Sequence, residues 1–188
     1  MKRFFVFRWL YLLLLGLFAV VSTASARPYV FGYIAWWVDE AQAMRSLPDV
    51  DRLKFMEWRL GSDGRIANMH GWPAEWSGLR ARAAALGIPV DVTLTLFDVA
   101  DFNALFDSPE RVKRLQSELL QQLTNDPGIA GIHWDVEIFS PVNAQAQQRY
   151  RALVGEMAQQ LKRMQPARST SVFLNFNADR YLYDAASL

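Results

Sequence analysis

The sequence predicts an α/β fold, because segments with strand character alternate with segments of helical periodicity along the whole chain. Such alternation is typical of parallel βαβ units, which build either a doubly wound open sheet or a (β/α)8 barrel. The loop after the first strand lacks the glycine-rich pattern of a phosphate-binding open sheet. The third and fourth strands each carry polar residues on one whole face, as the inside of a small barrel with a polar mouth would. We therefore favour the (β/α)8 TIM-barrel type.

Five segments have the composition of β-strands, because β-branched and aromatic residues are concentrated in each of them. They are residues 29–37, 53–60, 90–97, 131–139 and 170–177. A barrel of eight strands takes about 250 residues, so we expect that this chain of 188 residues holds only about five βα units.

Helical segments lie between these strands, and their ends carry recognisable signals. Gly87 follows an alanine-rich segment and predicts a helix C-cap. Ser108 is an N-cap candidate, with Pro109 at the first helical position. The predicted helices are residues 76–86, 109–125 and 143–164, with a short helical or loop piece through Ala41 and Met44 after the first strand.

The fourth strand carries most of the chemistry. Because side chains alternate along a strand, its two faces differ completely. One face holds His133, Asp135 and Glu137, and the other holds Ile132, Trp134, Val136 and Ile138. Burying unpaired charge costs several kcal/mol, so the two acids are expected to line a polar cavity.

Residues 130–137, Ala-Gly-Ile-His-Trp-Asp-Val-Glu, resemble the D-G-x-D-x-D-x-E signature of glycoside hydrolase family 18, the chitinase-like barrels. The segment from Phe31-Gly32-Tyr33 through Trp37 is similar to the first strand of that family. The third strand also precedes the motif by about the expected distance. Two aspartates of the signature are replaced in this chain, by Ala130 and His133.

The resemblance implies a role for each matching acid. Glu137 takes the position of the catalytic acid, which protonates the glycosidic oxygen while the N-acetyl carbonyl of the substrate attacks the anomeric carbon. Asp135 takes the position of the aspartate that orients the acetamido group and stabilises the oxazolinium ion. Two acids spaced i and i+2 lie roughly 6.6 Å apart along a strand, so each disfavours ionisation of the other.

His133 is a departure from the signature, and two interpretations are open. It either donates a hydrogen bond that holds Asp135 in place, or it is an interior histidine without a catalytic role. We expect substrate contacts from residues near other strand ends, namely Tyr33, Trp37, Glu57 and Asn175. No metal or other cofactor is expected, because three ligands on one strand rarely converge on one ion.

The N-terminal residues have the layout of a secretory signal peptide. Basic residues precede an apolar run at 9–21, and Ala24-Ser25-Ala26 supplies a cleavage site. The apolar run is shorter than the roughly 20 residues that span a bilayer. We therefore expect cleavage after Ala26, a barrel domain over residues 27–188, and a secreted or periplasmic protein without stable membrane insertion. An uncleaved N-terminal anchor is the other possibility.

Charge and cysteine content bear on the possible binding partners and on disulfide bonds. Removing residues 1–26 lowers the basic residues from 20 to 17, against 19 acidic ones, so no basic stripe favours nucleic acid. The absence of cysteine excludes disulfides. The resemblance to glycoside hydrolase family 18 implies a polysaccharide or oligosaccharide partner, and nothing in the sequence indicates an oligomeric state.

Three functions fit the sequence. The first is a glycosidase acting on β-linked N-acetylglucosamine polymers such as chitin, peptidoglycan or an exopolysaccharide. The second is a non-catalytic chitinase-like sugar-binding protein, or a truncated inactive relative, which the replacements at 130 and 133 favour. The third is an envelope protein whose acids serve only structure or protein contacts.

Overall fold

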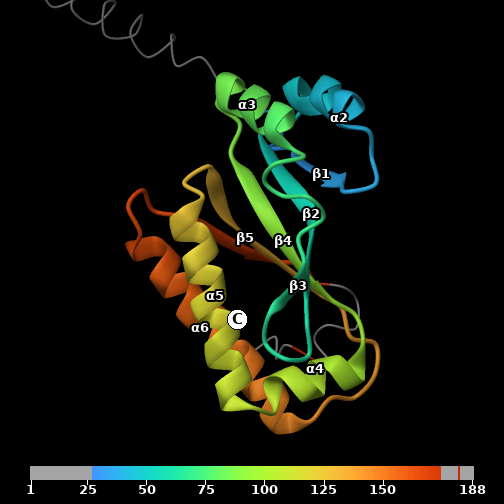
Figure 1. Ribbon diagram of the computed structural model, residues 1–188, viewed down its shortest axis with the longest axis vertical. Coiled ribbons are helices and arrows are strands. Elements are labelled where there is room, and N and C mark those ends of the chain that lie inside the picture. The colour runs from blue at the N-terminus through green and yellow to red at the C-terminus, as the bar shows by residue number, and fades with distance from the viewer. Residues whose placement is uncertain (1–26, 175–181, 183–188) are drawn as a thin grey trace, which may run out of the picture.

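The computed structural model describes residues 27–174 and Leu182 (Figure 1). Its elements, in chain order, are β1 (Phe31–Ala35), α2 (Glu40–Ser46), the 3-10 helix η1 (Leu47–Asp49), β2 (Arg52–Leu60), β3 (Ile66–Asn68), α3 (Ser77–Leu86), β4 (Val90–Leu96), α4 (Val99–Phe106), α5 (Pro109–Asn125), β5 (Ile129–Val136), α6 (Ala144–Arg163) and β6 (Ser169–Val172).

Five strands form a parallel sheet in the order β1-β2-β4-β5-β6, and the short β3 pairs antiparallel with β2. Successive parallel strands are therefore neighbours throughout. A doubly wound sheet reverses its strand order at a switch point, whereas a barrel adds strands in sequence. The fold is thus a partial TIM-barrel type, and the sheet is not closed within the described residues.

The sheet is strongly curved, as a barrel wall is. The ammonium of Lys54 in β2 donates a hydrogen bond of 2.7 Å to Ser171 Oγ in β6. Three strand spacings separate β2 from β6 in the sheet order, or about 14 Å in a flat sheet. Curvature alone brings these two side chains together.

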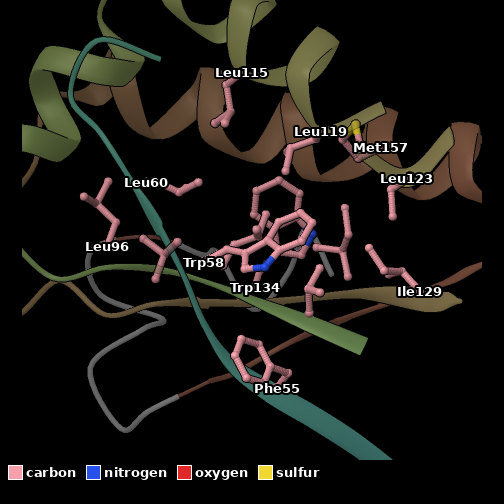
Figure 2. Close-up of a cluster of buried hydrophobic side chains, with 14 of the residues drawn as sticks. Phe55, Trp58, Leu60, Leu96, Leu115, Leu119, Leu123, Ile129, Trp134 and Met157 are labelled. Carbon is pink, nitrogen blue, oxygen red and sulfur yellow. The ribbon is translucent and has the colours of Figure 1, made fainter. Parts of the chain in front are cut away.

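The core lies between the convex face of the sheet and the helices. Figure 1 shows α5 and α6 side by side over one face of the sheet. Their buried residues Leu115, Leu119, Leu123 and Met157 meet the outward side chains of the strands, as Figure 2 shows around Trp134. The apolar side of each of these two helices is therefore its buried face.

Several predicted boundaries are confirmed. Gly87 ends α3 in the left-handed region, at φ 69°. The Ser108 side chain accepts a hydrogen bond from the Arg111 backbone N–H and caps α5. The strand predicted at 131–139 is wrong at its end, however, because β5 stops at Val136 and Glu137 follows it. The sequence analysis also missed β3 and α4, which Asp98 caps.

Some predictions concern residues outside the described part of the chain. The signal peptide at 1–26, Asn175 and the last residues of the fifth predicted strand belong to this group. Within the described part, no helix is both long and apolar enough to cross a membrane.

Candidate active site

The concave face of the sheet carries polar side chains in successive layers. Register places Tyr33 beside Lys54 and Lys54 beside Asp91 in one row. Thr93, His133 and Ser171 form the next inward-facing row, two residues further along the strands. Asp135 lies two residues further along β5, toward the carboxyl ends of the strands, where barrel enzymes hold their active sites.

The lowest layer is a closed ion pair. The Arg52 guanidinium donates two hydrogen bonds to the Asp91 carboxylate, from Nε and Nη2, each 2.6 Å long. It also contacts Ser169. Gly131 leaves the space for this layer, since a Cβ there would lie 2.7 Å from Asp91 Oδ1 and 2.5 Å from the Ser169 carbonyl oxygen. A glycine in the motif is required by this close approach.

The middle layer is a chain of hydrogen bonds through His133. Its Nδ1 lies 2.8 Å from Ser171 Oγ, and its Nε2 lies 2.9 Å from the Tyr33 hydroxyl oxygen. The Lys54 ammonium can only donate, so Ser171 accepts from Lys54 and its hydroxyl hydrogen is free to go to Nδ1. Burial, together with the charge of Lys54, lowers the pKa of His133 to about 4, so the imidazole is neutral at physiological pH.

This arrangement overturns one sequence-based hypothesis. Both ring nitrogens of His133 are engaged by Ser171 and Tyr33, so His133 donates no hydrogen bond to Asp135. The expected contact is wrong because the histidine lies one layer below, where curvature brings side chains of β1 and β6 within its reach. Alternation along β5 placed His133 correctly on the polar face, but alternation says nothing about partners from distant strands.

Asp135 and Glu137 form the upper layer. Asp135 is buried, with 6% of its surface exposed. Burial, the charge of Glu137, a side-chain hydrogen bond with Glu137 and the charge of Glu57 raise the pKa of Asp135 to about 6. Glu137 is held beyond the strand by its backbone N–H, which donates to the Leu96 carbonyl oxygen over 3.1 Å. The hydrogen bond and the poorly solvated site therefore favour the protonated form of Asp135.

Asp135 also has an unused polar atom. Its Oδ1 is buried and has no hydrogen-bond partner among the described residues. An unsatisfied carboxylate oxygen in the interior costs about 1–3 kcal/mol, so it marks a position that a ligand group or solvent can satisfy. An amide N–H of a substrate has the donor chemistry for this role.

Glu57 is brought close to this pair, but its oxygens are already engaged. Thr95 Oγ1 donates to Oε2 over 2.6 Å, and Arg59 Nη2 donates to Oε1 over 2.6 Å. His70 Nε2 lies 3.4 Å from the same Oε1. These contacts and the charges of Arg59 and His70 lower the pKa of Glu57 against the opposing effect of its burial. Glu57 therefore contributes a fixed negative charge beside Asp135.

The sequence analysis missed Lys54 as a residue of the polar face. Lys54 lies between Leu53 and Phe55 in a strand whose neighbouring positions are buried. A lysine within a buried strand is unfavourable without partners, and that pattern could have singled it out. His70 had no detectable signal in the sequence, because the β3 hairpin that carries the chain back to it was not predicted.

Aromatic side chains gather around His70, which contacts Glu57. Trp36 stacks on His70 with ring centroids 4.2 Å apart, and Trp37 meets Trp36 edge to face at 5.4 Å. A cavity of about 380 Å³ opens here between Trp36, Asn68, His70 and Trp76. Trp37 lies beyond the end of β1 and is 64% exposed. Within residues 27–174 and at Leu182, no group of three or more His, Cys, Asp or Glu side chains is placed to hold a metal ion.

Neither a family model nor a curated protein sequence matches the chain. Solved structures match its fold. A class V chitinase from Pseudomonas fluorescens Pf-5 has a TM-score of 0.65 at 16% identity, over 83% of this chain and 48% of that one. A chitinase from Chromobacterium violaceum ATCC 12472 has 0.61 at 13%, over 82% and 50%.

The spore cortex-lytic enzyme SleL of Bacillus cereus has a TM-score of 0.61 at 15% identity, over 78% of this chain and 35% of that one. The chain thus spans about a third to a half of the length of these proteins. The chitinase-like fold that the motif at 130–137 led us to expect is therefore confirmed. The chain has the fold of part of a chitinase-like barrel.

Proposed function

We propose that this chain carries the catalytic acids of a glycoside hydrolase that cleaves β-linked N-acetylglucosamine polymers by substrate-assisted, retaining hydrolysis. The observation that carries the proposal is the hydrogen-bonded pair of Asp135 and Glu137 at the carboxyl end of β5. In a chitinase-like fold, this is the end of the sheet where barrel enzymes bind their substrates. Chitin, peptidoglycan and an exopolysaccharide all contain the required sugar.

The reaction needs one proton on the pair before it starts. Glu137 donates that proton to the glycosidic oxygen, the bond from the anomeric carbon to this oxygen breaks, and the carbonyl oxygen of the substrate's acetamido group bonds to the same carbon. Water then attacks the anomeric carbon and returns a proton to Glu137, which restores the acetamido group. The net result is addition of one water across the glycosidic bond with retained configuration.

Asp135 has two roles in the proposed reaction. The acetamido N–H can donate to the unpartnered Oδ1 of Asp135, which orients the attacking carbonyl oxygen. A negative charge on Asp135 then stabilises the positive oxazolinium ion. Because the pKa of Asp135 is raised to about 6, Asp135 takes up a proton more readily than an ordinary aspartate, and its hydrogen bond with Glu137 offers a route for that proton to Glu137.

The aromatic residues beside the site suit a sugar ring. Trp36 and Trp37 present partly exposed indole faces, and Tyr33 is half-exposed with its hydroxyl on His133. Aromatic rings stack on the apolar faces of flat ligands. Tyr33 and Trp37 are therefore proposed as substrate contacts, as is Asn175, whereas Glu57 acts through its charge because its oxygens are engaged by protein groups.

A non-catalytic sugar-binding protein is the second candidate. The observation that favours it is His133, which places a neutral imidazole where the family signature has a carboxylate. Because His133 replaces a carboxylate, the site has one acid fewer near Asp135 than the family signature has. The two candidates predict the same ligands but differ in turnover.

The test is hydrolysis of a fluorogenic chitobioside by the full chain, alongside calorimetric binding of N-acetylglucosamine oligomers. Glu137→Gln should abolish turnover and retain binding, while Asp135→Asn should reduce both. Glu110→Gln on the exposed start of α5 is the matched control and should leave both unchanged. Binding without turnover by the unaltered protein would favour the second candidate, and loss of neither property in Glu137→Gln would refute the first.

We further propose that the mature protein starts at Arg27 and reaches the periplasm or the exterior. The support is the signal-peptide layout of residues 1–26. Intact-mass measurement of the protein recovered from the periplasmic or culture fraction tests this directly. A mass that includes residues 1–26, in a membrane fraction, would instead indicate an uncleaved anchor.

A further inference from the structure

A half-exposed arginine lies on the concave face at the height of the acid pair. Register places Arg59 of β2 beside Thr95 of β4, and Thr95 beside Asp135 of β5. The preceding residues Trp58 and Leu94 are buried in the core, so alternation turns Arg59 and Thr95 toward the concave side. Two strand spacings, about 10 Å, separate Arg59 from Asp135 along the sheet. Arg59 therefore belongs to the row that carries the candidate acids.

The guanidinium of Arg59 is fixed by one contact. Its Nη2 donates to Glu57 Oε1 over 2.6 Å. Glu57 is held in turn by Thr95 Oγ1, which donates to Oε2 over 2.6 Å. The Glu57 side chain is 4% exposed, whereas that of Arg59 is 53% exposed. A buried carboxylate thus anchors one end of the guanidinium and leaves the rest of it accessible.

The accessible part of the guanidinium carries unused donors. An arginine has five N–H donors in a rigid fork. Within residues 27–174 and at Leu182, the side chain of Arg59 donates only to Glu57. Arg52 shows the contrast, because its Nε and Nη2 both donate to Asp91 and its side chain is 16% exposed. Arg52 is committed to the fold, whereas Arg59 retains donors for a ligand.

A cavity lies next to these donors. Asn68 of β3 is the register partner of Arg59, and it lines the cavity of about 380 Å³ together with Trp36 and His70. Trp36 is 39% exposed, and its indole offers an apolar wall of the kind on which flat ligands stack. His70 Nε2 lies 3.4 Å from Glu57 Oε1, so the carboxylate that anchors Arg59 also borders a wall of the cavity. The region therefore combines an aromatic wall with a fixed cation.

Charge decides which sugars this cation favours. Asp135, Glu137 and Glu57 make the neighbourhood acidic, so a ligand anion is repelled there unless a cation meets it. A carboxylate accepts two parallel N–H bonds from an arginine fork, and a neutral hydroxyl group does not reproduce that pairing. Arg59 thus admits a carboxylate at one defined position in an otherwise acidic site.

We propose that Arg59 is a specificity-determining residue that binds a carboxylate of the substrate, so that the preferred glycan is an acidic N-acetylglucosamine polymer and not neutral chitin. This inference rests on the proposed function and narrows its substrate. Two sources supply such a group, namely the lactyl ether of N-acetylmuramic acid in peptidoglycan and a uronic acid in an exopolysaccharide. Both present the same planar anion to the guanidinium.

The test is calorimetric binding in a Glu137→Gln background, in which no substrate is consumed. The ligands are a tetrasaccharide of alternating N-acetylglucosamine and N-acetylmuramic acid and a hyaluronan tetrasaccharide, each as the free acid and as the carboxyl methyl ester. One of the free acids should bind about tenfold more tightly than its ester, and which one does so identifies the source. This advantage should shrink as salt is added, because a half-exposed ion pair is screened.

Substitutions at Arg59 assign the preference to this residue. Arg59→Gln should abolish the preference for acid over ester. Arg59→Lys should keep part of it, because it retains the charge without the fork. Arg45→Gln in the last turn of α2 is the matched control and should leave the preference unchanged. Comparing acid with ester within each variant removes any general effect of the substitution on the neighbouring acids.

Equal binding of acid and ester by the protein with Arg59 intact would overturn the proposal, and so would a preference that survives in a folded Arg59→Gln protein. The first comparison needs no variant at Arg59, so it decides the matter even if Arg59→Gln does not fold. Turnover of the chitobioside without a carboxylate preference would refute this inference and leave the proposed function standing. A carboxylate preference without turnover by the unaltered protein would refute the glycosidase activity and leave the carboxylate site.

Discussion

The Tyr33 hydroxyl oxygen lies 2.9 Å from Nε2 of His133, which ties β1 to β5 across two intervening strands. This contact exists only because the sheet is curved. It engages the second ring nitrogen of the histidine, while Ser171 engages the first. His133 is consequently a neutral structural link below the acids.

The first prediction concerns the acid stability of the protein. The pKa of folded His133 is about 4, below its ordinary value of 6.5, so the unfolded chain binds more protons between these values. The contribution of His133 to stability is full above pH 6.5 and is lost as pH falls toward 4. His133→Gln should therefore flatten the decline of the unfolding free energy over this range.

Urea titrations at several pH values measure that difference directly. Tyr33→Phe is the informative comparison, because it removes the hydroxyl partner and retains the ring near His133. The explanation fails if the unaltered protein and His133→Gln lose stability in parallel over the whole interval. Asp135 has the opposite pH slope in part of the same interval, so only differences between variants are interpretable.

The second prediction is a gain of stability from removing a catalytic charge. The pKa of Asp135 is raised from 3.8 to about 6, so the folded protein binds more protons than the unfolded chain between these values. Its stability consequently falls as pH rises through this window, and ionised Asp135 destabilises the fold at neutral pH. Asp135→Asn should raise the unfolding free energy at neutral pH by about 1 kcal/mol, after allowance for solvent screening.

Denaturant unfolding of the two proteins at neutral pH and near pH 4 tests the sign. The gain should shrink at the lower pH, where the acid of the unaltered protein is largely protonated. Equal stability differences at both values would mean that the carboxyl charge is not the cause.

The sequence determined the strand alternation, the sequential parallel order and the polar face of β5, because each follows from local periodicity. It could not provide the partners of His133, which come from β1 and β6 through curvature. The position of Glu57 likewise could not be predicted from local periodicity alone. The register between β2 and β4 shifts between Met56 and Trp58, which lets Trp58 enter the core and Glu57 join the polar face. Strict alternation from Lys54 would have put Trp58 on the polar face.

The third prediction concerns the core behind the site. Trp134 is fully buried, packs against Tyr150, and donates from Nε1 to Thr170 Oγ1 over 3.1 Å. Trp134→Ala should cost about 3–5 kcal/mol of unfolding free energy through the cavity that it leaves. Thr170→Val keeps the volume but removes the acceptor, and should cost about 1–3 kcal/mol.

Guanidinium unfolding of both variants separates packing from hydrogen bonding. Trp134 in β5 and Thr170 in β6 both lie on the convex side of the sheet, away from the acids, so the Asp135 titration should stay the same in Thr170→Val. A Thr170→Val protein as stable as the unaltered one would show that the indole N–H gains nothing from this acceptor.

The last prediction concerns sugar contact by Trp37. The indole is 64% exposed and has Trp36 at its edge, so its removal leaves no cavity in the core. Trp37→Ala should change the unfolding free energy by no more than about 0.5 kcal/mol. If the indole stacks on a sugar ring, the loss of about 0.5–1.5 kcal/mol of aromatic contact weakens binding of N-acetylglucosamine oligomers about 2- to 10-fold. Trp37→Phe should recover part of the affinity, because a smaller aromatic face remains.

Calorimetry with a series of oligomer lengths locates the contact, since only oligomers long enough to reach Trp37 should distinguish the variants. Unaltered affinity at every length would place the sugar elsewhere, and a large loss of stability would mean that Trp37 supports the fold instead.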